Sequence, residues 1–376
     1  MTPAIHGHGR PERPERQGRR LRRFTALALA AALVLPLVAA TPGAATATAP
    51  TLSQLIGQKL IVRMDGTTPS ADLLGRIRRG EVGGVILFGA NVTTRTALVT
   101  LTAELHRAAT AGGQPRLLIA VDQEGGAIKR IPWAPPTLSP PAMGRLGSVS
   151  VARTQGQQTG TALKALGIDI DLAPVADVPA STSSILYRQG RTWSFSASRT
   201  ASLASAFSAG LESAGVAPSM KHFPGLGFAT LDTDRSLVSI RASRTALAPG
   251  LLPYRAAIAG GLPLVMLSNA TYAAWDPYAA AGWSPAIETL LRGTLGFRGA
   301  TITDSLDGTA MARGYPTSHL AYRAAKAGTD LLLLTGDEAS TRADFAVLLA
   351  DARSGVLSTS TLAASYARIL ALKARW

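Results

Sequence analysis

The sequence of 376 residues contains no cysteine. Disulfide bonds, thiolate metal sites, cysteine nucleophiles and lipid-modified cysteine anchors are therefore all excluded. Histidine is scarce as well: of the five, His6 and His8 stand near the start of the chain, and His106 and His319 stand in stretches with helical spacing. A metal site built from several histidines is not expected, and no motif implies a metal or an organic cofactor.

Lysine is also rare, because 32 of the 38 basic residues are arginine. The formal net charge is +15, and residues 1–23, with seven Arg and two Glu, supply +5 of it. The remainder has no block of Lys and Arg and no basic helix interleaved with aromatic residues, so we do not expect a nucleic-acid partner. With 47% hydrophobic residues the chain can build a packed core, which excludes a disordered or collagen-like protein.

The N-terminal apolar run is short for a bilayer span. It covers the uncharged residues Ala26 to Ala40, directly after four Arg at residues 19–23, whereas a span needs about 20 residues. A basic stretch before a short apolar run is typical of a signal peptide. We predict a signal peptide and short linker over residues 1–49 and a secreted or cell-envelope protein with no stable membrane anchor after cleavage. An uncleaved anchor is the alternative.

From about Pro50 onward, apolar runs typical of buried strands alternate with stretches of helical spacing. This alternation indicates a parallel sheet covered on both faces. Eight runs indicate an α/β fold, a (β/α)8 barrel of TIM type that occupies residues 50–376 as a single domain, with a doubly wound open sheet as the alternative. The runs are Leu60–Val62, Val82–Phe88, Arg116–Val121, Ile168–Leu172, Pro218–Phe223, Leu264–Leu267, Ala300–Thr303 and Asp330–Leu334. The helices expected between them include Thr96–Ala109, Ser148–Ala165, Thr200–Ser213, Ser284–Thr294 and Ser318–Ala327.

Polar residues follow several of these runs, at the end where barrel enzymes carry their chemistry. The third run is followed by Asp122-Gln123-Glu124-Gly125-Gly126, the fifth ends near Lys221-His222, and the seventh is followed by Asp304. Carboxylates with a Lys-His pair at one rim could be metal ligands, nucleophiles, general acids or acceptors for sugar hydroxyls. Because histidines are so few, a hydroxyl-rich substrate fits this set better than a metal site.

Short motifs follow one another along residues 52–373. They are Gly83–Phe88, Asp122–Gly126, Leu172–Asp177, Lys221–Gly225, Leu291–Phe297, Ile302–Leu306 and Ala327–Asp330. In this order and at this spacing the chain resembles glycoside hydrolase family 3, and within it the single-domain bacterial β-N-acetylhexosaminidases that act on peptidoglycan fragments.

The resemblance implies a retaining mechanism and a set of site residues. Asp304 would attack the anomeric carbon, and Asp122, Arg130, Lys221 and His222 would contact sugar hydroxyls. Since Lys221 and His222 are successive residues at a strand end, alternation alone cannot point both into the barrel. We expect one of them to leave the pleat and enter the mouth.

The sequence departs from the family pattern at the loop after the fifth run. The hexosaminidases carry an Asp-x-His dyad there, whose His is the general acid/base, and the matching positions in this chain are Asp232 and Asp234. The Arg expected ahead of Ser194-Phe195 is Trp193, and Arg191 stands two residues upstream as a possible substitute.

Two interpretations of this loop remain open. In the first, Asp234 or Asp232 is the proton donor, with its pKa raised when two carboxylates crowd each other. In the second, the donor is lost, and the chain is a glycan-binding barrel that turns over no substrate or only activated ones. The first predicts a glycoside hydrolase that removes terminal β-linked N-acetylglucosamine, or a related β-sugar, from peptidoglycan-derived or other oligosaccharides. This first interpretation is favoured because Asp304 and the hydroxyl-binding residues are kept. We also expect the protein to be a monomer.

Overall fold

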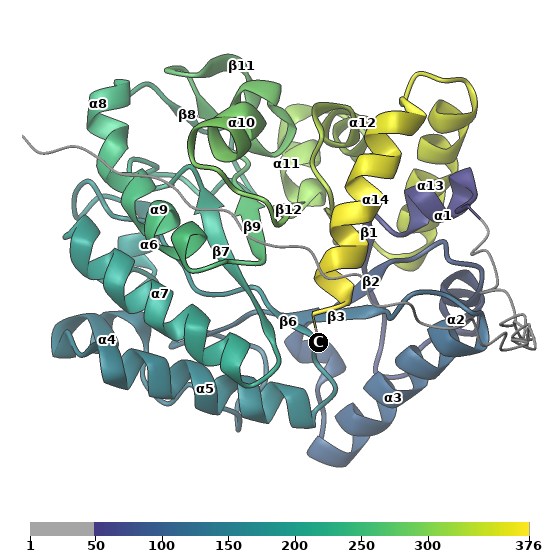
Figure 1. The fold of residues 1–376 in the computed structure, drawn as a ribbon, viewed down its shortest axis with the longest axis horizontal. Coiled ribbons are helices and arrows are strands. Elements are labelled where there is room, and N and C mark those ends of the chain that lie inside the picture. Colours follow the sequence, from purple (N-terminus) through teal and green to yellow (C-terminus); the bar gives the residue numbers. More distant parts are fainter. Residues whose placement is uncertain (1–48, 376) are drawn as a thin grey trace, which may run out of the picture. The chain divides into compact units, whose positions relative to one another are not determined.

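The computed structural model describes residues 49–375, so the predicted signal peptide lies outside the described residues. Eight strands, all paired in parallel, form the centre of the fold (Figure 1). They are β1 (Leu60–Arg63), β2 (Gly84–Leu87), β3 (Leu118–Val121), β6 (Ile170–Asp171), β7 (Ala217–Phe223), β9 (Leu264–Leu267), β12 (Ala300–Thr303) and β13 (Leu332–Leu334). Their spatial order is β12-β9-β7-β6-β3-β2-β1-β13.

The sheet closes on itself. A parallel bridge between Ile302 and Leu331 joins the last strand in this order to the first, and the N–H groups of Thr303 and Leu331 continue the ladder across the seam. The predicted (β/α)8 barrel is therefore confirmed over the open-sheet alternative. Each of the eight predicted runs overlaps one barrel strand.

Helices surround the barrel in the order that the alternating pattern predicts (Figure 1). The longer ones are α2 (Ala71–Arg78), α3 (Arg95–Ala111), α5 (Val149–Ala165), α7 (Ala197–Ser213), α9 (Leu252–Ala259), α11 (Leu306–Arg313), α12 (Thr317–Ala327), α13 (Glu338–Arg353) and α14 (Thr359–Lys373). The shorter ones are α1 (Leu52–Gly57), α4 (Pro140–Leu146), α6 (Ile185–Arg188), α8 (Arg244–Leu247) and α10 (Pro285–Thr289), which continues as a π-helical turn over Leu290–Thr294. Single 3₁₀ turns cover Gly89–Asn91, Ala248–Leu251 and Ala281–Trp283.

Local sequence explains where the long helices begin. The side chains of Thr94, Ser148 and Ser196 accept the N–H groups of Ala97, Val151 and Arg199, and so cap α3, α5 and α7. Such caps satisfy backbone donors that the first helical turn leaves without partners. The positions at which these three helices begin are therefore explained by local capping residues together with the apolar pattern.

In the described residues 49–375, five short strands outside the barrel form two small sheets within the loops that follow β3, β7 and β9. β4 (Gln123–Gly125) and β5 (Ile128–Lys129) form an antiparallel pair directly after β3. β8 (Ser239–Ile240), β10 (Thr271–Tyr272) and β11 (Asp276–Ala280) form a second small sheet. These additions fold the Asp122–Gly126 run and the loop after β7 over the carboxyl ends of the barrel strands.

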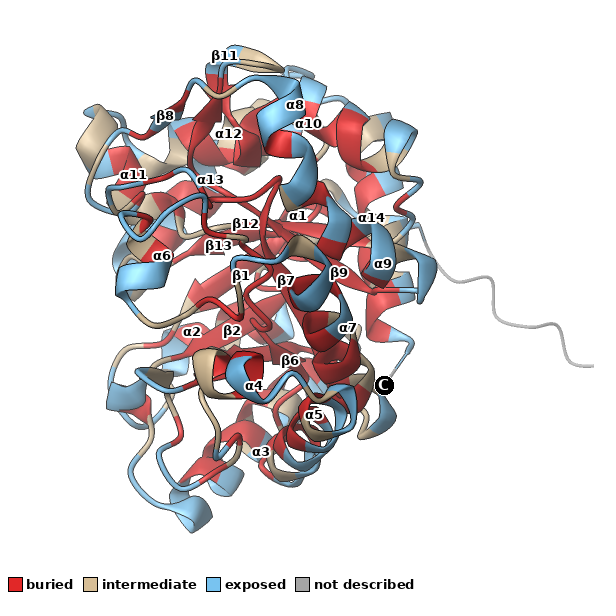
Figure 2. Ribbon diagram, turned by 90° about the vertical axis from the view of Figure 1, so that its left-hand side faces the viewer, coloured by how far each residue is buried: buried red, intermediate tan, exposed pale blue. Residues whose placement is uncertain are grey.

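Alternation along each strand divides the core into two layers. Ile61 of β1 faces the barrel interior with Ile86 and Leu333, whereas its neighbours Leu60 and Val62 pack outward against the helices. Figure 2 accordingly shows buried strands at the centre and helices that are exposed on their outer side. The interior layer fills the barrel with aliphatic side chains and leaves the polar chemistry to its mouth.

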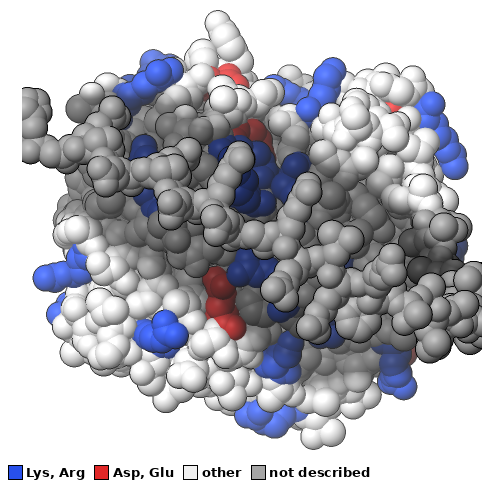
Figure 3. Space-filling view, in the orientation of Figure 1, with Lys and Arg blue, Asp and Glu red and all other residues white. Residues whose placement is uncertain are grey.

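The excess of basic residues is visible at the surface. On the face drawn in Figure 3, Lys and Arg side chains stand in separate groups, and few Asp or Glu are seen between them. Within residues 49–375, no helix is both long enough and apolar enough to cross a membrane.

Candidate active site

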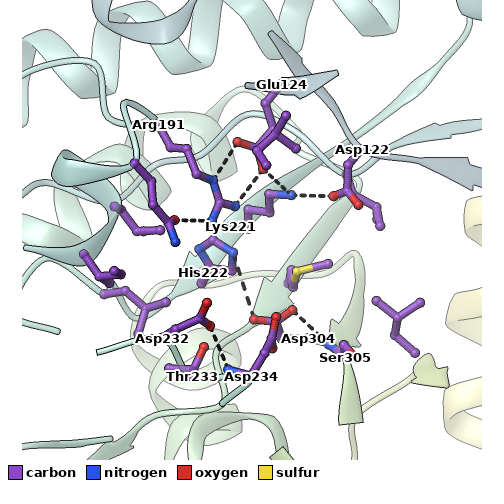
Figure 4. Close-up of a pocket in the computed structure, with 18 of the residues that line it drawn as sticks. Asp122, Glu124, Arg191, Lys221, His222, Asp232, Thr233, Asp234, Asp304 and Ser305 are labelled. Atoms are coloured by element: carbon purple, nitrogen blue, oxygen red, sulfur yellow. Dashed lines mark hydrogen bonds and ion pairs between the residues drawn. The ribbon is translucent and has the colours of Figure 1, made fainter. Parts of the chain in front are cut away.

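A cavity of about 670 Å³ lies at the carboxyl ends of the barrel strands. Its floor is aliphatic and includes Ile86, Leu172, Met266 and Leu333. The structure brings together in its wall all eight site residues predicted from the sequence, which are Asp122, Arg130, Arg191, Lys221, His222, Asp232, Asp234 and Asp304. Figure 4 labels all of them except Arg130. Lys221 and His222 lie near the end of β7, and the others lie on segments that follow β3, α6, β7 and β12, so only the closed barrel makes them neighbours.

Lys221 is held between two carboxylates. Its Nζ lies 2.7 Å from Asp122 Oδ1 and 2.7 Å from Glu124 Oε1, and the lysine is buried. Burial lowers the pKa of Lys221, but the nearby Asp122 and Glu124 carboxylates outweigh it, so that the pKa is raised overall. Lys221 is therefore a fixed cation, and the partly exposed Asp122 carboxylate beside it can accept hydrogen bonds from a ligand.

Glu124 is a site residue to which the sequence motifs assigned no role. Its carboxylate accepts Nε and Nη2 of Arg191 at 2.9 and 2.7 Å, in addition to the contact with Lys221. Burial raises the pKa of Glu124, but Lys221 and Arg191 reverse that effect and lower it to about 2. Arg191 does reach the pocket as predicted, whereas the neighbouring Trp193 is buried and donates its indole N–H to the Val175 carbonyl.

Both Lys221 and His222 line the pocket, although they are consecutive. The register between β7 and β9 shifts between Met220 and Phe223, so the end of β7 does not follow regular alternation. His222 Nδ1 lies 2.8 Å from Asp177 Oδ2, and since a carboxylate only accepts, Nδ1 carries the donated hydrogen. Its Nε2 points to Asp304 Oδ2 at 4.0 Å.

Asp177 is a second residue whose role the motifs did not disclose. Besides His222 Nδ1, it accepts the backbone N–H groups of His222, at 3.2 Å, and Leu226, at 2.5 Å. It is fully buried beneath the pocket. Asp177 therefore sets the orientation of the His222 ring without itself facing the cavity.

Asp304 follows β12 and has its carboxylate in the cavity (Figure 4). Oδ1 accepts the N–H of Ser305 at 2.8 Å, and the side chain is 16% exposed. The Ser305 hydroxyl in turn lies 2.6 Å from Thr335 Oγ1, which ties the end of β12 to the end of β13. Oδ2 remains available toward the centre of the pocket, beside His222.

The loop between Phe228 and Ser236 brings Asp232 and Asp234 to the same cavity. The Asp234 N–H donates to Asp232 Oδ1 at 3.0 Å. Asp234 stands at the exposed rim, yet its carboxyl faces the pocket wall, and partial burial together with the Asp304 and Asp232 carboxylates raises its pKa to about 7. A carboxyl with such a pKa is about half protonated at pH 7 and mostly protonated at lower pH.

Arg130 contacts the Asp122 carboxylate at the oxygen that Lys221 does not contact. Its Nη2 is 3.8 Å from Asp122 Oδ2, and its guanidinium lies 5.7 Å from the centre of the Phe88 ring. This long ion pair leaves donors of Arg130 available to a ligand in the cavity. Phe88, an aromatic residue that the sequence did not single out, forms the adjoining wall.

The arrangement places two carboxyl groups in one pocket, Asp304 and an Asp234 whose pKa is raised to about 7, with fixed cations and hydrogen-bond acceptors around them. Paired carboxyl groups in different protonation states are what glycosidic bond cleavage requires. Residues 51–372 match the family described as Glycosyl hydrolase family 3 N terminal domain. The chain belongs to glycoside hydrolase family 3.

Individual relatives agree with this assignment of the family 3 hydrolase. It is 32% identical over 342 residues to an "Uncharacterized secreted glycosyl hydrolase" of Arthroderma benhamiae, covering 88% of this chain and 96% of that one. It is 34% identical over 294 residues to a "Beta-hexosaminidase" of Nitrosomonas eutropha, covering 74% and 80%. The resemblance predicted from the motifs is confirmed, and the protein is a glycoside hydrolase.

The fold comparison agrees. A family 3 β-N-acetylglucosaminidase of Paenibacillus superimposes with a TM-score of 0.83 and 33% sequence identity over 87% of this family 3 hydrolase. The chain spans 63% of that longer protein. The barrel fold is therefore shared with an enzyme of the same family.

Proposed function

We propose that the protein is a secreted, retaining β-N-acetylhexosaminidase. It would remove terminal β-linked N-acetylglucosamine, or a closely related β-sugar, from peptidoglycan-derived or other oligosaccharides. The observation that carries this proposal is the pairing of Asp304 with Asp234 in one pocket, where the raised pKa of Asp234, about 7, leaves a large fraction of this carboxyl protonated near neutral pH. The names of the hexosaminidase and N-acetylglucosaminidase relatives support the sugar class.

In the first step, Asp304 attacks the anomeric carbon and forms an ester to the sugar, while the bond to the leaving oxygen breaks. That oxygen takes the proton of Asp234, so the aglycone departs as a neutral alcohol. The Ser305 N–H on Asp304 Oδ1 leaves Oδ2 available for the attack.

In the second step, Asp234 acts as a base because it has lost its proton. It takes a proton from a water molecule, whose oxygen attacks the anomeric carbon and displaces Asp304. The sugar leaves with its original anomeric configuration after two inversions, and both carboxyl groups return to their starting states.

The remaining residues hold the sugar. Lys221 and Arg130 supply donors for its hydroxyls, Asp122 supplies acceptors, and His222 offers Nε2 beside Asp304. Because Glu124 and Asp177 fix Lys221, Arg191 and His222 before any ligand arrives, little ordering is left for the binding step. Donors and acceptors that are fixed in this way suit the binding of a single sugar ring with its hydroxyl groups.

The test compares aryl β-glycosides of N-acetylglucosamine, glucose and xylose as substrates of the purified protein, with Asp304→Asn as the control. We expect the highest kcat/KM for the N-acetylglucosaminide and loss of most turnover in the control. If the protein binds oligosaccharides but hydrolyses no glycoside, the glycan-binding alternative is correct.

Export is supported by the basic stretch and short apolar run at the N-terminus and by the secreted relative. N-terminal sequencing of protein from the culture medium should place the first residue between about residues 41 and 50. A mature form that retains Met1 would contradict the proposed route.

A further inference from the structure

The loop that carries Asp234 rests on the helix that follows Asp304. This helix, α11, begins at Leu306, and its third residue is Gly308. A Cβ atom at Gly308 would lie 2.5 Å from the Asp234 carbonyl oxygen and 3.2 Å from both its carbonyl carbon and its Cβ. The backbone of Asp234 therefore occupies the space that any side chain at position 308 would fill.

The helix in this contact is anchored firmly. Asp307 accepts hydrogen bonds from both the N–H and the hydroxyl of Thr335 at the end of β13, and from Thr317 at 3.1 Å. Leu306, Thr309 and Ala310 are buried against the barrel. A clash at Gly308 cannot be relieved by movement of α11 without breaking these contacts.

The loop, by contrast, is only partly packed. Phe228 and Leu231 are 42% and 55% exposed, whereas Ala229 and Thr233 are buried. Two hydrogen bonds join it to α6, from Arg188 Nη2 to the Thr230 carbonyl and from the Ile185 N–H to the Ala229 carbonyl, and neither involves Asp234. If one side of the contact must yield, it is the loop.

We propose that Gly308 is a positioning residue for proton donation: its bare Cα seats Asp234 against the helix that follows Asp304, and so sets the separation of the two carboxyl groups. The inference rests on the proposed function, since it assigns Asp234 the role of proton donor. One turn of helix links the two halves of the catalytic pair, and a retaining pair tolerates little change in spacing.

Displacement of the loop would also change the pKa of Asp234, because charged groups surround its carboxyl. They are Asp304 at the end of β12, Asp232 on the same loop, Arg191, and Asp122 after β3. Outward movement of the loop takes Asp234 away from the Asp304 carboxylate and into water. Both changes favour the charged form of Asp234, so its pKa falls.

The test is Gly308→Ala in the full chain, with Gly75→Ala as the matched control. Gly75 also lies within a helix, α2, where an added Cβ would meet only the end of the Arg79 side chain, at 3.2 Å. Alanine is the better helix former, so neither change should lower the melting temperature by weakening its helix. We expect Gly308→Ala to lower kcat at least tenfold for glycosides with poor leaving groups, and no more than about twofold for activated aryl glycosides, since donation contributes about 10²–10⁴-fold.

Two further readouts distinguish positioning from a general structural role. The basic limb of the pH–kcat profile should move to lower pH, and ¹³C NMR should report a lower pKa for the Asp234 carboxyl. The NMR measurement does not depend on turnover, so it tests the positioning of Asp234 by Gly308 even if the wild-type protein hydrolyses nothing. Absence of hydrolysis would instead refute the proposed function. Equal losses on both substrate types, or an unchanged Asp234 pKa, would overturn the inference.

Discussion

Glu124 and Arg191, 67 positions apart, form a two-point ion pair in which Arg191 Nε and Nη2 lie 2.9 and 2.7 Å from the Glu124 carboxylate oxygens. The same carboxylate contacts Lys221 Nζ at 2.7 Å. One buried anion therefore orients two cations of the pocket. Its removal would leave both cations without their shared partner.

We expect Glu124→Gln to lower the free energy of unfolding by about 3 kcal/mol, the lower end of what breaking a buried ion pair costs. KM should rise because Lys221 and Arg191 lose their fixed positions. Urea denaturation and steady-state kinetics measure the two effects. The matched control is Glu81→Gln, since Arg79 and Glu81 form a fork of similar lengths, 2.8 and 2.9 Å, at the surface. There the loss should stay below about 1 kcal/mol; equal losses at both positions would contradict the organising role of Glu124.

Asp304→Asn should remove most turnover and leave the fold unchanged, because the side chain lies at the barrel mouth and is outside the aliphatic core. In the unmodified protein, a slow fluorinated glycoside should add the mass of its sugar to the peptide that contains Asp304. Peptide mass spectrometry locates the label. Attachment to another carboxylate would show that a different residue is the nucleophile.

Asp234→Ala should affect substrates according to their leaving groups. Glycosides with poor leaving groups need the donated proton, so their turnover should fall by about 10²–10⁴-fold, while activated aryl glycosides lose less. Azide should partly restore turnover of the activated substrates and give a glycosyl azide, because a small anion can enter where the carboxylate was. Asp232→Ala is the comparison: if it gives the azide product and Asp234→Ala does not, Asp232 is the donor.

The pH dependence of kcat follows from the raised pKa of Asp234. Burial and the Asp304 and Asp232 carboxylates place this pKa at about 7, and the donor must be protonated for the first step. With a poor leaving group, activity should therefore fall as the pH rises above about 7. In Asp234→Ala this basic limb should be absent with activated substrates. A limb that persists unchanged would assign it to another group.

Lys373 predicts a pH dependence of stability that is separate from catalysis. Its Nζ is buried and donates to Gln58 Oε1 and the Gly83 carbonyl, and burial lowers its pKa to about 7. Between about pH 7 and the unfolded-state pKa of about 10.4, the unfolded chain binds more protons at this residue, so stability should rise with pH by up to about 1.4 kcal/mol per unit. Lys373→Met should remove this contribution in thermal melts from pH 7 to 10. The exposed Lys326→Met should not alter the slope.

Much of the site could be predicted from the sequence because several residues that line the pocket sit at strand ends. Asp304, Lys221 and His222 directly follow or end buried apolar runs, and parallel strands in a barrel bring such ends to one rim. Arg191 was predicted only through its place next to Trp193, yet it too reaches the pocket. These positions depend on periodicity, which short stretches of sequence carry.

The residues that position the pocket side chains act through contacts between segments far apart in the chain. Their roles could not be predicted from the sequence. Glu124 lies in a predicted motif, but its bonds to Arg191 and Lys221 exist only once three loops meet. Asp177 likewise shows its role only when β7 brings His222 to it. Gly308 was assigned no role from the sequence, and its contact with the Asp234 backbone exists only in the folded chain.

The sequence by itself therefore determined the eight strands, several of the helices between them, the family and the residues at the mouth, because apolar periodicity and short motifs are local properties. The tertiary structure alone decided which anion orients which cation, that Lys221 and His222 both enter the pocket, and how near Asp234 stands to Asp304. Those outcomes depend on distances of a few ångströms between segments that the chain separates by many residues. Only the packing of the closed barrel sets such distances.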